Sequence, residues 1–171
     1  MEGMELLLTR RTVRRFTGEP LAPGQLEQIV RAGMSAPSAN ARRPWHILTV
    51  ESAEKRLALK PLCQWWQMLD KAGAAVVVCA DTALCENMQP EYQVDDCAAA
   101  CENMLLAAYA LGLGGVWLGV CESAEQAPAV KHLLGIPDGM RIMGMLALGH
   151  PSVQPKPIDR FKKRQWHKEV W

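Results

Sequence analysis

Two hydrophobic patterns run along this chain, one typical of helices and one typical of buried strands. Apolar residues at helical spacing and capping signals predict helices over Gly3–Thr9, Pro23–Met34, Ser52 to before Pro61, Val94–Leu111 and Ser123 to about Gly135. Short apolar runs predict strands over Trp45–Val50, Ala74–Ala80, Val116–Val120 and Ile142–Leu148. The order of these elements is mixed, which favours a layered α+β fold over a doubly wound one.

The sequence predicts a single domain that ends in a C-terminal arm. Its 171 residues contain no repeat, low-complexity tract or long polar linker that divides them. From about residue 150 the segment carries Pro151, Pro155 and Pro157, so we expect an extended arm that brings basic residues to a surface. The domain therefore spans 1–171.

Composition excludes several classes of partner. The net charge of +1 gives no global field to attract nucleic acid or an acidic membrane surface, so any anion site is local. The 18 uncharged residues from Met104 to Cys121 meet a membrane-span length, but Gly112, Gly114 and Gly115 end a helix and turn the chain there. We therefore predict no membrane segment.

Six cysteines occur without a C-x-x-C pair or a secretory leader, which predicts a reducing, cytoplasmic setting. Cys97 and Cys101 are four residues apart, so a metal or redox pair is conceivable on one helix face. The favoured interpretation is two core cysteines, since no further ligand pair lies at metal-binding spacing. No metal is expected, and His150 is the one histidine kept as a weak ligand-contacting candidate.

A basic stretch follows the first predicted helix, with four arginines between Arg10 and Arg15. Arg binds phosphate bidentately, and the Thr12 hydroxyl can add a hydrogen bond. In an extended segment alternate residues point one way, which would align Arg10, Thr12 and Arg14. The stretch is either a phosphate site or a solvated basic patch.

A second stretch, Ala36 to Trp45, is a loop of small residues whose backbone is free to face a flat ligand. Trp45 opens a strand and is expected in the core. A third stretch, Gly112 to Gly119, is not a dinucleotide fingerprint, because its glycines follow a helix and lead into a strand. Phosphate-loop, serine-hydrolase and zinc-protease motifs are absent from the sequence.

Taken in order, these stretches resemble the nitroreductase family of flavoproteins. The family typically shows R-R-S-x-R-x-F, then P-S-x-x-N-x-Q-P-W, then a G-x-x-W-x-G strand. Glu102–Ala108, Leu134–Pro137, Leu148–Pro151 and the tail Asp159-Arg160-Phe161 with His167 and Trp171 also look like a compact branch of it. The resemblance covers nearly the whole chain.

The resemblance implies an α+β sandwich with a central mixed or antiparallel sheet, a two-fold homodimer, and FMN at sites made by both subunits. NAD(P)H would be the hydride donor. The residues implied to bind FMN are Arg10, Arg11, Thr12, Arg14, Pro37, Ser38, Ala39, Asn40, Gln67, Val116, Trp117, Leu118, Gly119 and Arg160. Gln64 is an alternative to Gln67, and the Pro37–Asn40 loop would come from the partner subunit.

Three departures from the family pattern stand out. Thr12 replaces the usual Ser, Ala41 stands where Asn is usual with Asn40 one place earlier, and Arg43 replaces the usual Gln. The shifted Asn puts the ring-side hydrogen bonds in doubt. Arg43, which follows Arg42, suggests a more anionic substrate or cofactor than usual.

The implied activity is ping-pong hydride transfer from NAD(P)H to a small acceptor, which is a nitroaromatic, a quinone, a flavin or an activated alkene. A flavin carries the difficult chemistry itself, so no catalytic acid, base or nucleophile is expected in the chain. Arg14 is the candidate to stabilise the reduced ring near N1. The alternative is a protein that binds or senses FMN or another phosphate-bearing ligand without turnover.

Overall fold

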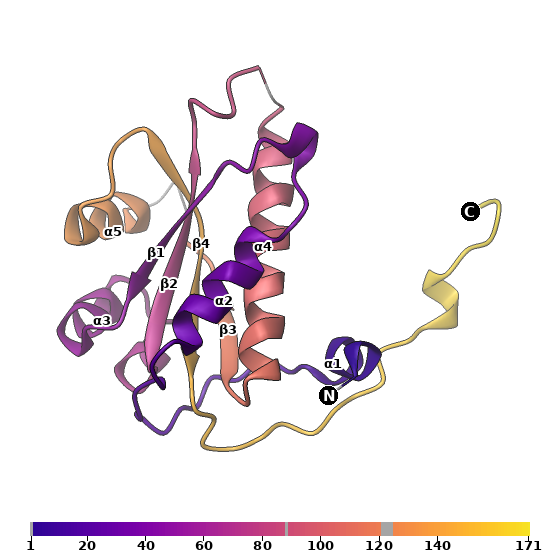
Figure 1. The fold of residues 1–171 in the computed structure, drawn as a ribbon, viewed down its shortest axis with the longest axis horizontal. Helices are drawn as coiled ribbons and strands as arrows, with labels where there is room; N and C mark the ends of the chain where they lie inside the picture. Colours follow the sequence, from indigo (N-terminus) through magenta and orange to yellow (C-terminus); the bar gives the residue numbers. More distant parts are fainter. Residues whose placement is uncertain (1, 88, 121–124) are drawn as a thin grey trace.

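A four-stranded sheet lies at the centre of the computed structural model, which describes residues 2–87, 89–120 and 125–171 (Figure 1). Its strands are β1 (Trp45–Val50), β2 (Ala74–Asp81), β3 (Gly114–Leu118) and β4 (Met140–Gly149), in the spatial order β1-β2-β4-β3. Each neighbouring pair is antiparallel. Thr12 adds a parallel bridge to Gly115 along the outer edge of β3, so the edge has a mixed character.

β2 is buried on both faces, as its unbroken apolar run predicts. The side chains of Ala75 and Val77 belong to one hydrophobic core, and those of Val76 and Val78 belong to the other. This alternation follows from the two-residue period of a strand. Both faces of the sheet must therefore be covered by helices.

Helices form a layer on each side of the sheet (Figure 1). α2 (Gln25–Met34) and α4 (Pro90–Ala110) contribute to the core that holds Val76, while α3 (Ala53–Leu59) and α5 (Gln126–Leu134) contribute to the core that holds Val77. α1 (Gly3–Thr9) lies against α4, where the Tyr109 hydroxyl donates a hydrogen bond to Thr9 Oγ1 at 3.1 Å. The predicted α+β sandwich is confirmed.

Small residues bring α2 and α4 close together. A Cβ atom built on Gly33 of α2 would lie 2.7 Å from Met104 Cγ and 3.3 Å from the Ala100 carbonyl oxygen of α4. Ala100 itself is fully buried. The small-residue stretch of the long helix thus serves a close helix-to-helix contact inside this chain.

Several predicted boundaries were wrong by a few residues. α4 begins at Pro90 rather than Val94, because proline fits the first helical turn without losing a needed N–H. β3 runs over Gly114–Leu118 rather than Val116–Val120, since of the three glycines before Val116 only Gly112 takes a left-handed conformation (φ 78°), and Gly114 and Gly115 already belong to the strand. The proposed Ser123 cap lies outside the described residues, and α5 begins at Gln126.

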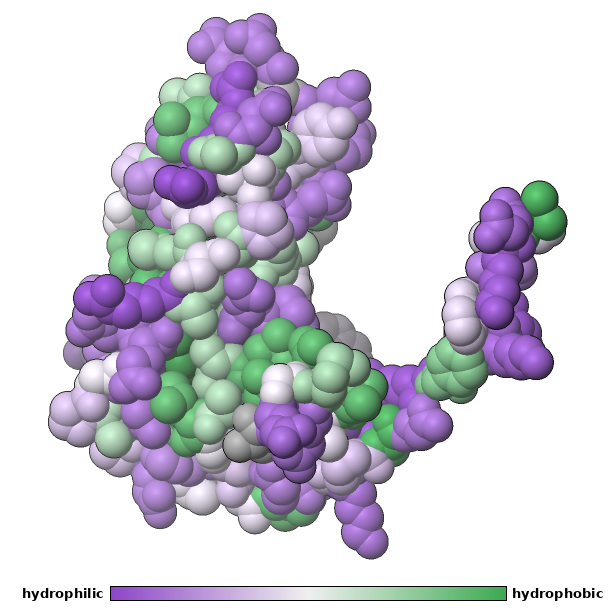
Figure 2. Space-filling model, turned by 45° about the vertical axis from the view of Figure 1, so that its right-hand side comes forward, coloured by the Kyte–Doolittle hydropathy of each residue, from purple (hydrophilic) through white to green (hydrophobic). Residues whose placement is uncertain are grey.

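The segment after β4 leaves the body of the molecule. It is first held by Ser152, whose N–H donates to the Arg15 carbonyl oxygen at 2.9 Å, and then runs past α1. Figure 2 shows its end standing away from the rest of the chain. The predicted arm is extended apart from the 3-10 turn Lys163–Gln165, and its residues from 158 onward are exposed.

Among the helices of the described ranges, none has the length and apolar character needed to span a membrane.

Candidate functional site

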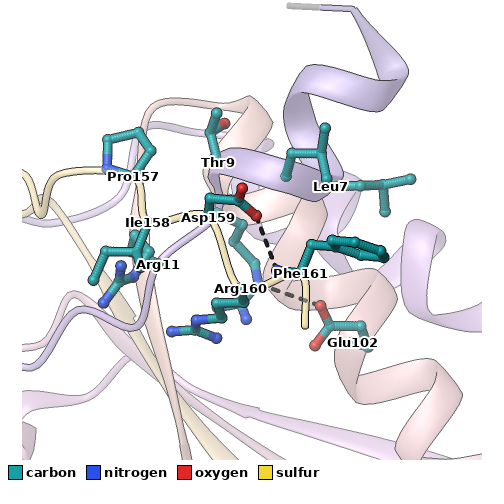
Figure 3. A pocket seen from close by; sticks show the side chains of 11 residues that line it. Leu7, Thr9, Arg11, Glu102, Pro157, Ile158, Asp159, Arg160 and Phe161 are labelled. Carbon is teal, nitrogen blue, oxygen red and sulfur yellow. Dashed lines mark hydrogen bonds and ion pairs between the residues drawn. The ribbon is translucent and has the colours of Figure 1, made fainter. Parts of the chain in front are cut away.

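Arginines from two distant parts of the chain lie beside α1, as Figure 3 shows for Arg11 and Arg160. Arg10 and Arg11 follow α1, and Arg160 comes from the C-terminal arm. Together they line a hollow of about 590 Å³, which we call the arginine hollow. Its other lining residues are Leu7, Leu8, Thr9, Glu102, Pro157, Ile158, Asp159 and Phe161.

The polar groups of the arginine hollow are only partly satisfied within the chain. Arg10 Nε lies 3.2 Å from Glu102 Oε1, and Arg11 Nη1 donates to the Lys156 carbonyl oxygen at 3.2 Å. The Nε atom of Arg11 is buried and has no hydrogen-bond partner among the described residues. A buried donor of this kind is costly unless an acceptor reaches it, so the donor set fits a phosphate group.

A second hollow lies at the end of β3 and is lined by six further residues that were predicted to bind the cofactor. Arg14, Gln67 and the strand end Val116–Gly119 line it, and its volume is about 540 Å³. We call it the strand-end hollow. The remaining lining residues are Cys63, Gln64, Trp65, Trp66 and Met68, so both glutamines considered from the sequence reach it.

Residues 10–14 connect the two hollows because they run along the edge of β3. The Val13 N–H donates to the Gly115 carbonyl oxygen at 2.9 Å, and a Cβ atom on Gly114 would lie 2.6 Å from Val13 Cβ. The Val13 side chain is therefore buried against β3. Along this segment Arg10 lines one hollow and Arg14 lines the other, while Thr12 between them pairs with β3.

Trp117, on β3, has its indole over β4. A Cβ atom on Gly144 would lie 2.5 Å from the Trp117 Nε1 atom, so glycine makes the room that this side chain occupies. The indole remains 38% exposed. Trp45, by contrast, is buried as predicted.

The predicted Pro37–Asn40 loop lines neither hollow of its own chain. It precedes β1 at the end of the sheet away from α1 (Figure 1). Its Ala39 N–H donates to Asp96 Oδ1 at 2.8 Å, and the Asp96 side chain is buried with Oδ2 unpaired among the described residues. Asn40, Ala41 and Arg43 all have φ near +50°, a backbone region that non-glycine residues seldom adopt.

Arg42 and Arg43 differ in their contacts. Arg42 Nη1 donates to the carbonyl oxygens of Leu84 and Glu86, so Arg42 ties the loop to the segment after β2. Arg43 donates its backbone N–H to Ser38 Oγ at 2.9 Å, and its residue is exposed. The guanidinium of Arg43 has no hydrogen bond or ion pair with any described residue and can meet an anion, whereas that of Arg42 has a structural role.

The cysteines around this region are held as thiols. Cys97 and Cys101 are fully buried in the core, as expected, and burial is the main cause that raises the pKa of each to about 12. The pKa of Cys85 is also raised, first by burial and then by the carboxylates of Asp81 and Asp96. No group of three or more metal-ligating side chains is present in the part of the chain that the structure describes.

His150 lies outside both hollows, and its carbonyl oxygen accepts the Thr17 N–H at 2.9 Å. Among the lining residues that sequence reasoning did not assign to a site are Glu102, the partner of Arg10, and Trp65, in the strand-end hollow. Glu102 stands in a helix segment that gave no hint of contact with Arg10, more than ninety positions away. Tryptophan is highly buried on average, so the residue type did not signal that Trp65 would be exposed.

Comparison with known proteins identifies the fold that carries these hollows. The profile of the Nitroreductase family matches residues 7–88 and 65–150. The chain belongs to this family. Its nitroreductase fold also matches a crystal structure from Parabacteroides distasonis with a TM-score of 0.90 and 31% identity, covering 98% of each chain.

Two relatives and one further solved structure show how far the similarity of this nitroreductase-family chain extends. A protein of Archaeoglobus fulgidus, provisionally named as an NADH dehydrogenase/NAD(P)H nitroreductase, is 38% identical over 173 residues, 99% of each chain. The NADPH-flavin oxidoreductase of Vibrio harveyi is 30% identical over 168 residues, 92% of this chain and 69% of its own length. A Desulfovibrio desulfuricans nitroreductase-type structure solved in complex with FMN has a TM-score of 0.86 and 26% identity, covering 100% of this chain and 99% of its own.

Proposed function

We propose that this chain is an FMN-dependent NAD(P)H oxidoreductase that reduces small organic acceptors. The observation that carries the proposal is the placement of a three-arginine hollow and a strand-end hollow at the two ends of residues 10–14. FMN is an elongated molecule with a phosphate at one end and a flat ring at the other. Membership of the Nitroreductase family and the flavin-dependent names of its relatives support the same cofactor.

In this proposal the arginine hollow holds the phosphate. Arg11 and Arg160 donate to its oxygens, and Arg10 joins them by exchanging its contact with Glu102 for one with the phosphate. Thr12 adds its hydroxyl from the adjoining segment. The unpaired Arg11 Nε is the donor for which the chain itself supplies no acceptor.

The strand-end hollow takes the ring. The segment Val116–Gly119 would line one face of the ring. The side-chain amide of Gln67 would hydrogen-bond to the polar edge of the ring. Arg14 places a positive charge in the same hollow, where it stabilises negative charge near N1 of the reduced ring. FMN bound there would supply the chemistry of hydride transfer between NAD(P)H and the acceptor.

Donor and acceptor take turns in one hollow, which gives ping-pong kinetics. The acceptor is a small nitroaromatic, quinone, flavin or activated alkene. No disulfide joins the cysteines of the described residues, so a reducing compartment such as the cytoplasm suits this activity.

The proposed active form is a homodimer. The arm carries exposed apolar side chains on a segment that stands away from the body: Ile158, Phe161, Trp166, Val170 and Trp171. α1 likewise exposes Met4, Leu7 and Leu8. A second copy would cover these surfaces and bring its Pro37–Asn40 loop to the strand-end hollow, which the loop does not reach within one chain.

The first test is the visible spectrum of the purified protein before and after NADPH or NADH is added without oxygen. A bound flavin band that bleaches rapidly supports the oxidoreductase. A band that persists would support the alternative of a flavin-binding or sensing protein without turnover. Protein that takes up no FMN would contradict both, and light scattering on the same sample tests the dimer.

A further inference from the structure

Two adjacent tryptophans beside the strand-end hollow differ sharply in burial. Trp66 is 1% exposed and belongs to the hydrophobic core with Leu69, whereas Trp65 is 73% exposed. The backbone N–H of Trp66 donates to the Cys63 carbonyl oxygen at 3.0 Å, and the backbone N–H of Leu69 donates to the Trp66 carbonyl oxygen at 3.1 Å. Trp66 therefore anchors the segment and holds Trp65 at the surface.

The exposed Trp65 is one of the residues that line the strand-end hollow. A tryptophan side chain has a large apolar face, and such a face gains most by contact with another flat apolar group. Arg14 also lines this hollow, and no aspartate or glutamate stands among its described lining residues. The hollow thus combines an available aromatic face with positive charge.

We propose that Trp65 is a specificity-determining residue that selects planar aromatic electron acceptors, neutral or anionic, by stacking its indole on their ring. This inference rests on the proposed function, because it assigns Trp65 to the acceptor of that reaction. Trp65 acts in binding, so its loss is expected to weaken the binding of a planar aromatic acceptor. Acceptors without a flat π face gain nothing from it.

The proposal is tested with the FMN-loaded protein and two acceptors, 4-nitrobenzoate and ferricyanide. Trp65→Ala is expected to lower kcat/KM for 4-nitrobenzoate about tenfold, through KM, as the loss of one aromatic stacking contact predicts. Trp65→Phe keeps a flat ring and is expected to retain most of this activity. Ferricyanide offers no ring to stack on, so its kcat/KM is expected to stay near the wild-type value in both variants.

A binding measurement separates this proposal from the proposed function. Calorimetry on oxidised protein, without NADPH, gives the Kd of 4-nitrobenzoate independently of turnover, and Trp65→Ala is expected to raise it about tenfold. Leu57→Ala, a change of an exposed apolar residue on α3, is the control and leaves both Kd and KM unchanged. An unchanged Kd and KM in Trp65→Ala would overturn the role of Trp65, whereas failure of NADPH to bleach the wild-type flavin would overturn the proposed function instead.

Discussion

The backbone N–H of Ala39 donates to a carboxylate oxygen of Asp96, 57 positions further along the chain, at 2.8 Å. This bond joins the loop before β1 to the buried face of α4. The loop contains three non-glycine residues with positive φ, which the chain keeps only because surrounding contacts determine the conformation. The buried carboxylate of Asp96, on α4, supplies one of these contacts by accepting the Ala39 N–H.

Replacing Asp96 tests that role. Asp96→Ala is expected to lower the free energy of unfolding by about 1–3 kcal/mol, because the Ala39 N–H loses its acceptor. If the loop contacts the ring of FMN, the same change raises the Kd of FMN several-fold. Urea unfolding and flavin titration measure the two effects, and Asp95→Ala, at an exposed neighbouring position, is the matched control. Equal behaviour of the two variants would contradict the role given to Asp96.

The arginine hollow is tested by comparing two flavins. Arg160→Ala is expected to raise the Kd of FMN about tenfold, as loss of one charged hydrogen bond predicts. Riboflavin has no phosphate, so its Kd is expected to stay near the wild-type value. Arg164→Ala serves as the control, because Arg164 lies on the same arm but does not line the hollow. A similar loss for both flavins would place Arg160 away from the phosphate.

Gly144 is expected to be intolerant of a side chain. In Gly144→Ala the new methyl group meets the Trp117 indole, at 2.5 Å from Nε1 if nothing moved. We expect a loss of about 1–3 kcal/mol in unfolding free energy, as overpacking predicts, together with weaker FMN binding as β3 shifts. Thermal unfolding and flavin titration measure these effects. Gly139→Ala is the control, since a Cβ atom there meets nothing within 4 Å and its φ is not positive.

Buried thiols make stability fall at alkaline pH. Cys97 and Cys101 have a pKa of about 12 in the folded chain against 9.0 when unperturbed. Between these values the unfolded chain releases protons that the folded chain keeps, so rising pH favours unfolding, by at most about 1.4 kcal/mol per pH unit for each thiol. Well below pH 9 both states keep the two protons, so the contribution of these thiols to the pH dependence vanishes.

The measurement is urea unfolding at pH 8 and pH 10.5. The double variant Cys97→Ala/Cys101→Ala is expected to lose less stability between these two values than the wild type. Other groups titrate in the same range, and comparison with the variant removes their contribution. An identical pH dependence in both proteins would show that these thiols do not titrate differently on unfolding.

The layered fold could be predicted from the sequence because its strongest signals are local. The valine-rich run of β2 has to be buried on both faces, and Trp45 begins a strand just after a loop of small residues. The start of β3 was missed because Gly114 and Gly115 look like turn residues. Their glycine character instead serves close contacts with Val13 and Leu105, which only the tertiary structure reveals.

The candidate site was predictable in a different way. Arg10 and Arg160 are 150 positions apart, so no spacing rule connects them, and their shared role was expected from the resemblance to a family. The structure brings them to one hollow. The exposure of Trp65 escaped prediction because it depends on how Trp66 packs, which is a property of the folded core.

The full burial of β2 also bears on how this protein can change over evolutionary time. Trp65, the residue proposed to select the acceptor, is exposed and lies on a segment outside the four strands. Substitutions there remove little buried apolar surface, so they cost little stability compared with changes in β2. The chain is therefore well suited to acquire a new acceptor preference, in nature or in directed evolution, without first needing compensating mutations in its core.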